Sequence, residues 1–233
     1  MKSFRINAAI IGVLFITTML AGMVDSYCVA PRLNIALDQI FQIKNVVLVG
    51  VFSVFAMAVG IVGIAIALYP VVKKQSETIA ITYVIFRTIE CGLLIIGPIS
   101  YLFLIVIGKA NIDSKFLNNI SCSAIPAIAI KMKYYTFQLS MMILGFNSLF
   151  LCYSFYKSQI IPRFLSIWGF VGYVFLFLSA LLDLLGLVDT INGIGALMYV
   201  PGGLWELLAF PIWLFIKGFK MSSEKMEQTI PIK

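Results

Sequence analysis

The sequence predicts an all-α integral membrane protein, a polytopic bundle of six transmembrane helices. Of its 233 residues, 61% are hydrophobic and only 12% are charged, whereas a soluble domain typically carries about twice that charged share. Six apolar runs are long enough to cross the hydrocarbon layer, which takes about 20 helical residues. Backbone groups in lipid must satisfy their own hydrogen bonds, so we expect these runs to be helices.

The six runs follow one another along the chain. They cover residues 6–24, 46–69, 79–107, 134–156, 164–185 and 195–216. The first run is longer than the apolar core of a signal peptide, so we expect an uncleaved spanning helix. Pro70 closes the second run, Pro162 opens the fifth, and Lys217 with Gly218 closes the sixth. We therefore predict one transmembrane domain over residues 1–220 and a polar cytoplasmic tail over residues 221–233.

The distribution of basic residues predicts the orientation. If the N-terminus is cytoplasmic, the cytoplasmic side holds most of the 17 Lys and Arg residues, and its turns are the shorter ones. The positive-inside rule then places both termini in the cytoplasm. We attribute the net charge of +7 to this bias. Lys/Arg-rich runs with interleaved aromatic residues are absent, so we expect no binding of nucleic acid.

Two of the outer loops are amphipathic. Residues 31–44 alternate apolar and polar side chains with an approximately helical period, and residues 112–133 mix apolar side chains with lysines. We expect both loops to lie in the membrane interface. The alternative for the second loop is a re-entrant dip over residues 124–130, which Pro126 and the short length of the segment disfavour.

The third run carries charges that lipid would not tolerate. Tyr83, Arg87 and Glu90 share one helix face, because they are spaced by four and three residues. Glu206 in the sixth run has a similar expected depth, and it follows residues 201–203 (Pro-Gly-Gly), where we expect a kink or break. We predict that Arg87, Glu90 and Glu206 form one buried network, since one guanidinium can serve two carboxylates.

This network is open to two interpretations. Its surplus negative charge must be neutralised by a proton, a bound cation or water, and broken helices at this depth are typical of transporter sites. Tyr83 belongs to the same ligand-binding or proton-carrying candidates. Alternatively, the charges only fix the register of the helices. Gln138 and Asn147 could extend the network, although no spacing aims them at it.

Four other side chains receive simpler interpretations. Asp25 and Asp183 are expected near the outer surface, and we interpret them as solvated helix ends rather than an outer mouth. Cys28 and Cys122 are both expected outside, where a disulfide could form. Two free thiols are favoured, because spacing alone does not establish a bridge.

The residues needed for the common types of catalysis are missing. The chain has no histidine, its four cysteines form no C-x-x-C pair, and no G-x-S-x-G motif occurs. We therefore predict no catalytic residue, no metal, no cofactor and no enzymatic activity. A small transporter or ligand-binding module, with an ion or small molecule as ligand, is one function that remains. The other is an accessory or regulatory protein that acts through a membrane protein partner or a second copy. Membrane lipids are expected partners in either case.

Four stretches form a combination that is more specific than any one of them. They are Ala67–Lys74, Ala80–Gly92 with Tyr83-x-x-Phe86-Arg87-x-x-Glu90, Lys157–Gly169, and Pro201–Phe219 with Trp205-Glu206. Together they resemble a family of small bacterial multi-pass membrane proteins catalogued as domain of unknown function 4386. The resemblance covers nearly the whole chain and implies a multi-helix protein of the bacterial inner (cytoplasmic) membrane.

The resemblance also singles out individual positions. They are Arg87, Glu90, Glu206, Trp213 and Leu214. The family often shows a small or polar residue where this chain has Trp205. No activity, ligand or cofactor comes with the resemblance.

Overall fold

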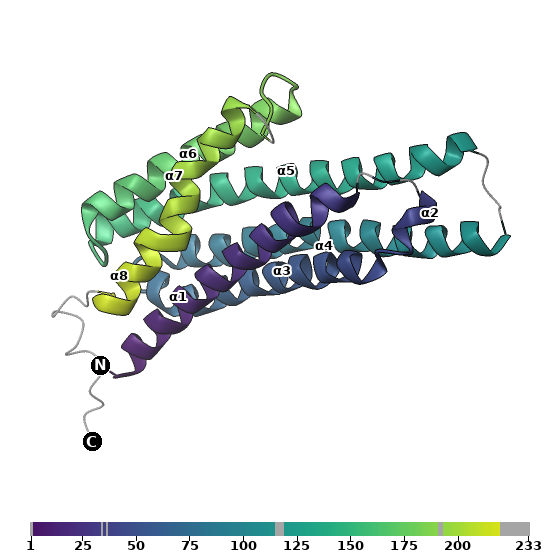
Figure 1. Ribbon diagram of the computed structural model, residues 1–233. Coiled ribbons are helices and arrows are strands. Elements are labelled where there is room, and N and C mark those ends of the chain that lie inside the picture. Colours follow the sequence, from purple (N-terminus) through teal and green to yellow (C-terminus); the bar gives the residue numbers. More distant parts are fainter. Residues whose placement is uncertain (1, 34, 36, 115–118, 191–192, 220–233) are drawn as a thin grey trace.

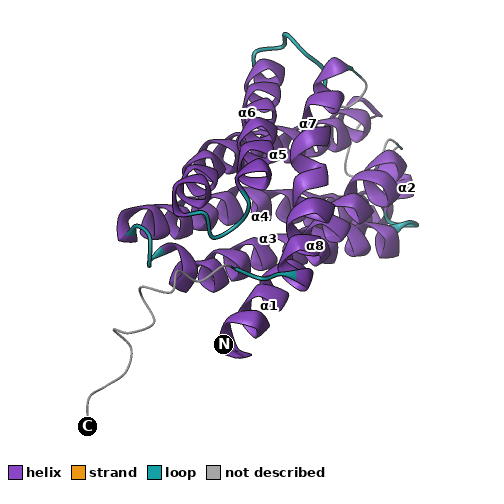
Figure 2. Ribbon diagram, turned by 90° about the vertical axis from the view of Figure 1, so that its left-hand side faces the viewer, coloured by secondary structure: helices purple, strands orange, loops and turns teal. Residues whose placement is uncertain are grey.

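The computed structural model describes residues 2–33, 35, 37–114, 119–190 and 193–219. All regular elements in these ranges are helical (Figures 1 and 2). The first half contains α1 (Lys2–Met23), η1 (Val24–Val29), η2 (Ala30–Leu33), α2 (Leu37–Ile40) and α3 (Lys44–Val72). The second half contains α4 (Glu77–Ser114), α5 (Asn119–Ser158), α6 (Arg163–Leu184), α7 (Ile194–Leu204), η3 (Trp205–Ala209) and α8 (Phe210–Ile216). The predicted tail over residues 221–233 lies outside the described ranges.

Six helical stretches are long and apolar enough to cross a membrane, which confirms the predicted number of spans. They cover residues 5–33, 44–72, 77–110, 124–158, 163–184 and 194–216. The protein is therefore a multi-pass membrane protein. The first stretch joins α1, η1 and η2, and the last joins α7, η3 and α8.

Neighbouring helices close into a ring. Each spanning helix packs on the next along the chain, from α1 and α3 through α4, α5 and α6 to α7, and α8 returns to α1. The start of α1 and the end of α8 lie at one end of the bundle, which Figure 2 shows facing the viewer. We call the opposite end, toward which α4 and α5 extend in Figure 1, the distal end.

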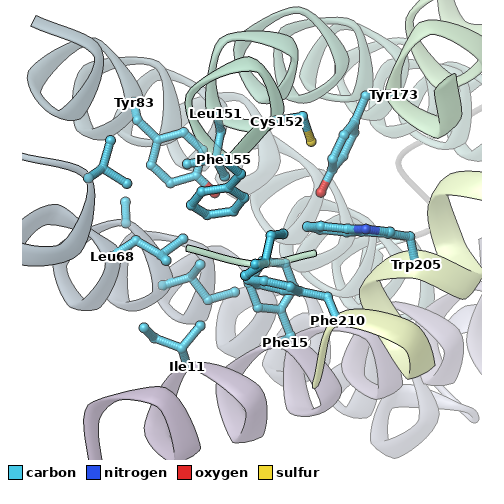
Figure 3. Packing of buried hydrophobic residues seen from close by; sticks show 14 of the residues in the cluster. Ile11, Phe15, Leu68, Tyr83, Leu151, Cys152, Phe155, Tyr173, Trp205 and Phe210 are labelled. Atoms are coloured by element: carbon cyan, nitrogen blue, oxygen red, sulfur yellow. The ribbon is translucent and has the colours of Figure 1, made fainter. Parts of the chain in front are cut away.

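The middle of the ring is filled by large aromatic side chains (Figure 3). Trp205 is fully buried and stacks on Phe210, with ring centroids 4.4 Å apart and an interplanar angle of 7°. Phe15 of α1 meets Phe210 edge-on at 5.3 Å, and Tyr173 of α6 meets Trp205 at 5.5 Å. Aromatic packing therefore fixes the last span against both α1 and α6.

The backbones of α6 and α7 meet at two glycines. A Cβ atom built on Gly172 would lie 2.9 Å from the Cα and the N atoms of Gly202 and 3.1 Å from the carbonyl carbon of Pro201. These are backbone atoms, which cannot rotate away. The close approach holds the segment before Glu206 against α6, as small residues do at contacts between membrane helices.

We expect Gly172→Ala to lower the free energy of unfolding by about 1–3 kcal/mol, because the new methyl group would force the two helix backbones apart. Stability in detergent, followed by thermal or denaturant unfolding, measures this. Gly203→Ala is the matched control, since its Cβ would meet only the Met19 methyl group at 3.7 Å. Equal stability of the two variants would contradict the close approach.

The re-entrant alternative for residues 124–130 was wrong, because α5 begins at Asn119 and runs through Pro126 as one helix. Residues 119–133 therefore belong to the same helix as the fourth span and do not form a separate loop. Proline removes only its own N–H bond here, and neighbouring apolar residues such as Ile125, Ala129 and Ile130 pack against protein. Phe116 and Leu117, which contributed to the amphipathic pattern, lie outside the described residues.

As a result, α4 and α5 are longer than a bilayer requires. They contain 38 and 40 residues, which correspond to about 57 and 60 Å at 1.5 Å per residue. The hydrocarbon layer is about 30 Å thick. Their paired ends therefore extend beyond it at the distal end.

A second, smaller core forms at the distal end. We call it the distal core, and its buried members are Val29, Leu33, Ile40, Val47, Val51, Tyr101, Leu104 and Ala129. Residues 31–44, expected in the interface, supply two of them through η2 and α2, and α2 packs on α4 and α5. The apolar side chains of Leu33 and Ile40 in this loop are thus covered by protein.

The turn between α3 and α4 is charged. Lys73 donates a hydrogen bond to Glu77, with 2.8 Å between Nζ and Oε1, and this bond raises the pKa of Lys73 above its ordinary value. Both side chains are exposed. They mark a turn in water or head groups. Pro70, which was predicted to close the second run, lies inside α3, and this helix continues to Val72.

Candidate functional site

Three predicted site residues form a continuous polar chain on α4. The Arg87 Nε–H donates to the Tyr83 hydroxyl over 2.9 Å, and Nη1 lies 3.2 Å from Oε2 and 3.3 Å from Oε1 of Glu90. The guanidinium carbon also lies 5.1 Å from the centre of the Tyr83 ring. Each of the three residues is only 1% exposed. The helical spacing of four and three residues creates this chain, as the sequence predicted.

Glu206 has a different partner. The Tyr173 hydroxyl of α6 donates a hydrogen bond to Glu206 Oε1 over 2.7 Å. Arg87 acts on Glu206 electrostatically, but no direct hydrogen bond or ion pair joins these two described residues. The structure therefore brings Arg87 and Glu90 into contact and places Glu206 nearby, on the side of α6.

The break in the last span lies beyond the predicted position. Residues 201–203 continue α7, and the helix widens only at η3, a π-helical turn in which the Phe210 N–H bonds the Trp205 carbonyl five residues earlier. Pro211 explains this, because its ring would clash with the Leu207 carbonyl in a regular α-helix. Such π turns often occur at functional sites, and Glu206 lies within this one.

The sequence reasoning missed Tyr173. It lies on a face of α6 whose members recur every three or four residues and are mostly small or polar: Ser166, Gly169, Tyr173, Leu176, Ser179 and Ala180. That period could have revealed a buried face with one polar group pointing into the bundle. Nothing in the sequence, however, says that this face meets η3.

Asn147 belongs to the site, whereas Gln138 does not. The Asn147 amide nitrogen donates to the backbone carbonyl of Tyr83 over 3.3 Å. Gln138 lies with Asp183 elsewhere in the bundle. Both had been candidates for extending the network, and both belong to α5. Nine residues separate them along this helix, a distance of about 13 Å, so only one of them reaches the site.

Two buried polar atoms of the site have no hydrogen-bond partner among the described residues. They are Nη2 of Arg87, a donor, and Oδ1 of Asn147, an acceptor. Leaving a buried group unpaired costs about 1–3 kcal/mol, and more when it is charged. The site thus has unused capacity to bind a further carboxylate, a water molecule or a small polar ligand.

Asp25 and Asp183 are not solvated helix ends, so that interpretation was wrong. Asp25 is 3% exposed and forms an ion pair with Lys133 of α5. Asp183 accepts hydrogen bonds from the Tyr134 hydroxyl and from the Gln138 amide, each over 2.6 Å. Both aspartates therefore connect helices to α5. Asp25 lies in η1, which is also a π-helical turn.

The cysteines show no metal site. Across the described residues, no three His, Cys, Asp or Glu side chains converge on one point. Cys28 is an exposed free thiol, and Cys91 and Cys152 are also free. The side chain of Cys122 lies outside the described residues.

The fold and the site together define the class of this protein, which is a membrane helix bundle with charged side chains buried at its centre. The chain matches the family model described as "Domain of unknown function (DUF4386)" over residues 10–218. This match covers most of the chain, so the protein belongs to that family. No curated protein and no solved structure matches it.

Proposed function

We propose that this protein is a small membrane transporter whose buried site, made of Arg87, Glu90 and Glu206, holds one exchangeable proton. The observation that supports this is a charge imbalance inside the bundle. One guanidinium lies among two carboxylates, and it is hydrogen-bonded to only one of them. A second bare carboxylate in an apolar interior is very costly, so a proton on Glu206 or Glu90 neutralises it.

The groups facing this proton come from three helices. Arg87, Glu90 and Tyr83 belong to α4, Tyr173 belongs to α6, and the buried Cys152 of α5 lies near Glu206. Arg87 is the one permanent cation among them. The balance of charge in the site is therefore set by how many protons the two glutamates hold.

The unpaired Nη2 of Arg87 gives proton release a structural consequence. Once Glu206 loses its proton, its carboxylate is attracted to this free donor. Glu206 lies in the π-helical turn between α7 and α8, where the regular helix is already interrupted. In this proposal, movement of Glu206 toward Arg87 shifts α8 and opens the site to the other side of the membrane.

In this proposal, the expected orientation, location and lack of enzymatic activity also hold. Both termini face the cytoplasm of a bacterial cell, and the protein lies in the inner membrane. It transforms no substrate, so the site binds and releases its cargo without breaking bonds. An ion or a small polar molecule that pairs with Arg87 and Asn147 fits the unpaired atoms.

Infrared difference spectroscopy of the reconstituted protein tests the proton. We expect the wild-type chain to show a carboxylic-acid carbonyl band that disappears as the pH is raised, and Glu206→Gln to remove or alter this band. Tyr173→Phe should shift the pH at which the band disappears, because it removes the donor to Oε1. A spectrum without any pH-dependent carboxyl change would contradict the proposal.

Thiol labelling tests the transport. A single cysteine at Gly203→Cys, one turn before Glu206, is introduced into a chain whose four native cysteines are serine. We expect it to react with a membrane-impermeant reagent from opposite sides at low and high pH. Glu206→Gln, which mimics the protonated carboxyl, should fix the accessible side. Access from one side at every pH would rule out transport by this site.

A further inference from the structure

An open apolar groove separates the end of α5 from the start of α6. Its volume is about 270 Å³, and it is lined by Cys152, Tyr153, Tyr156, Ser166, Ile167 and Phe170. The small side chains of Cys152 and Ser166 are buried and form its floor, whereas the aromatic residues and Ile167 are exposed along its sides. This surface lies within two spanning helices, so the groove opens toward the lipid.

Basic side chains stand at one end of the groove. Lys157 belongs to the last turn of α5, and Arg163 is the first residue of α6. The guanidinium of Arg163 lies over the Tyr156 ring, with 5.6 Å between its central carbon and the ring centre. No described carboxylate forms an ion pair with either residue.

The positions along α6 match the dimensions of a lipid. The groove residues Ser166, Ile167 and Phe170 follow Arg163 by three to seven positions, which places them about 5–10 Å further into the membrane. A phosphate at the level of Arg163 would therefore have its glycerol and first methylene groups at the level of the groove. Arginine suits this role, because its planar fork can donate two hydrogen bonds to one phosphate.

We propose that this groove is a binding site for one anionic phospholipid, with an acyl chain between α5 and α6 and the phosphate held by Lys157 and Arg163. Basic pockets between membrane helices are typical sites for acidic head groups. A zwitterionic lipid would fill the groove equally well with its chain. However, its cationic head group would lie beside two further positive charges, so charge sets the selectivity.

Native mass spectrometry of the full chain tests this site. The protein is purified in detergent, stripped of lipid and mixed with equal amounts of phosphatidylglycerol and phosphatidylcholine of identical chains. We expect one retained phosphatidylglycerol per chain and a preference of about tenfold over phosphatidylcholine, in keeping with the contribution of basic residues near a membrane surface.

Three variants give the proposal its controls. The double variant Lys157→Gln/Arg163→Gln should lose the preference while it keeps its fold, because both side chains are on the surface. Ile167→Trp, which fills the groove, should reduce the retention of both lipids. Arg5→Gln/Lys217→Gln removes one charge from α1 and one directly after α8, at the same end of the bundle, and should leave the preference unchanged.

Several outcomes would overturn the site. Equal retention of the two lipids by the wild-type chain would do so, as would an unchanged preference in Lys157→Gln/Arg163→Gln. A dimer without bound lipid, disrupted by Ile167→Trp, would show that a second copy of the chain covers the groove instead.

Discussion

Arg87→Met is expected to lower the free energy of unfolding by about 3–5 kcal/mol at neutral pH, because it leaves buried carboxylates without their cation. Glu90 is 1% exposed, and its carboxylate oxygens lie 3.2 and 3.3 Å from the guanidinium. The loss should shrink as the pH falls, since protonated carboxyl groups are neutral and cost less to bury. Denaturant titrations in detergent at several pH values measure it.

The double variant Arg87→Met/Glu90→Leu is the control. Replacing both members of a buried pair by apolar side chains of similar size is often close to neutral, so this variant should recover much of the lost stability. Glu206 keeps its hydrogen bond from Tyr173 in both variants. If the double variant were no more stable than Arg87→Met, an unpaired Glu90 could not be the cause of the loss.

Trp205→Ala is expected to cost about 3–5 kcal/mol, the range seen when a large buried aromatic side chain is removed. Trp205 is fully buried and contacts rings from α1, α6 and α8. Its indole N–H also donates to the Leu165 carbonyl over 2.8 Å. Thermal unfolding in detergent measures the loss, and the environment of Glu206 should change with it.

Trp168→Ala is the matched control. Trp168 is 39% exposed on the outer side of α6, and its indole N–H donates to the Pro201 carbonyl over 3.1 Å. Both residues are tryptophans whose indole N–H donates to a backbone carbonyl, but only Trp205 is buried. We expect a loss of about 1 kcal/mol, typical of one hydrogen bond. Similar losses in the two variants would mean that the aromatic core is not what stabilises the last span.

The bundle could be predicted from the sequence because lipid imposes one simple requirement. Each span must be apolar and long enough, so residues 46–69 or 164–185 identify themselves by hydropathy alone. The contact of Arg87 with Glu90 was predictable for a similar reason. Both lie on one helix, and their separation of three residues determines their geometry.

The contacts between helices could not be predicted in this way. Tyr173 and Glu206 are 33 residues apart, and Asp25 and Lys133 are 108 apart. A hydropathy pattern indicates which side of a helix is apolar, but in a membrane protein both the lipid side and the core side are apolar. The pairs therefore depend on how η1, α5, α6 and η3 are oriented toward one another.

The extension of α5 was missed because the pattern changes outside the lipid. Residues 119–133 contain serines, lysines and Pro126. Compared with the apolar composition of a spanning helix, these residues indicate a loop. Beyond the membrane, polar residues on a helix are ordinary. Only the contact of Ala129 with the distal core and the ion pair of Lys133 explain why the helix continues.

The excess length of α4 and α5 means that their ends at the distal end project from the hydrocarbon layer. The distal core lies toward this end, although all of its members except Ile40 belong to the spanning stretches. Within lipid, close packing and hydrogen bonds hold helices together, whereas helix ends in water depend on the hydrophobic effect, which cooling or urea weakens. Changes of temperature or cosolvent should therefore act mainly on the projecting helix ends, while changes of bilayer composition act mainly on the spans.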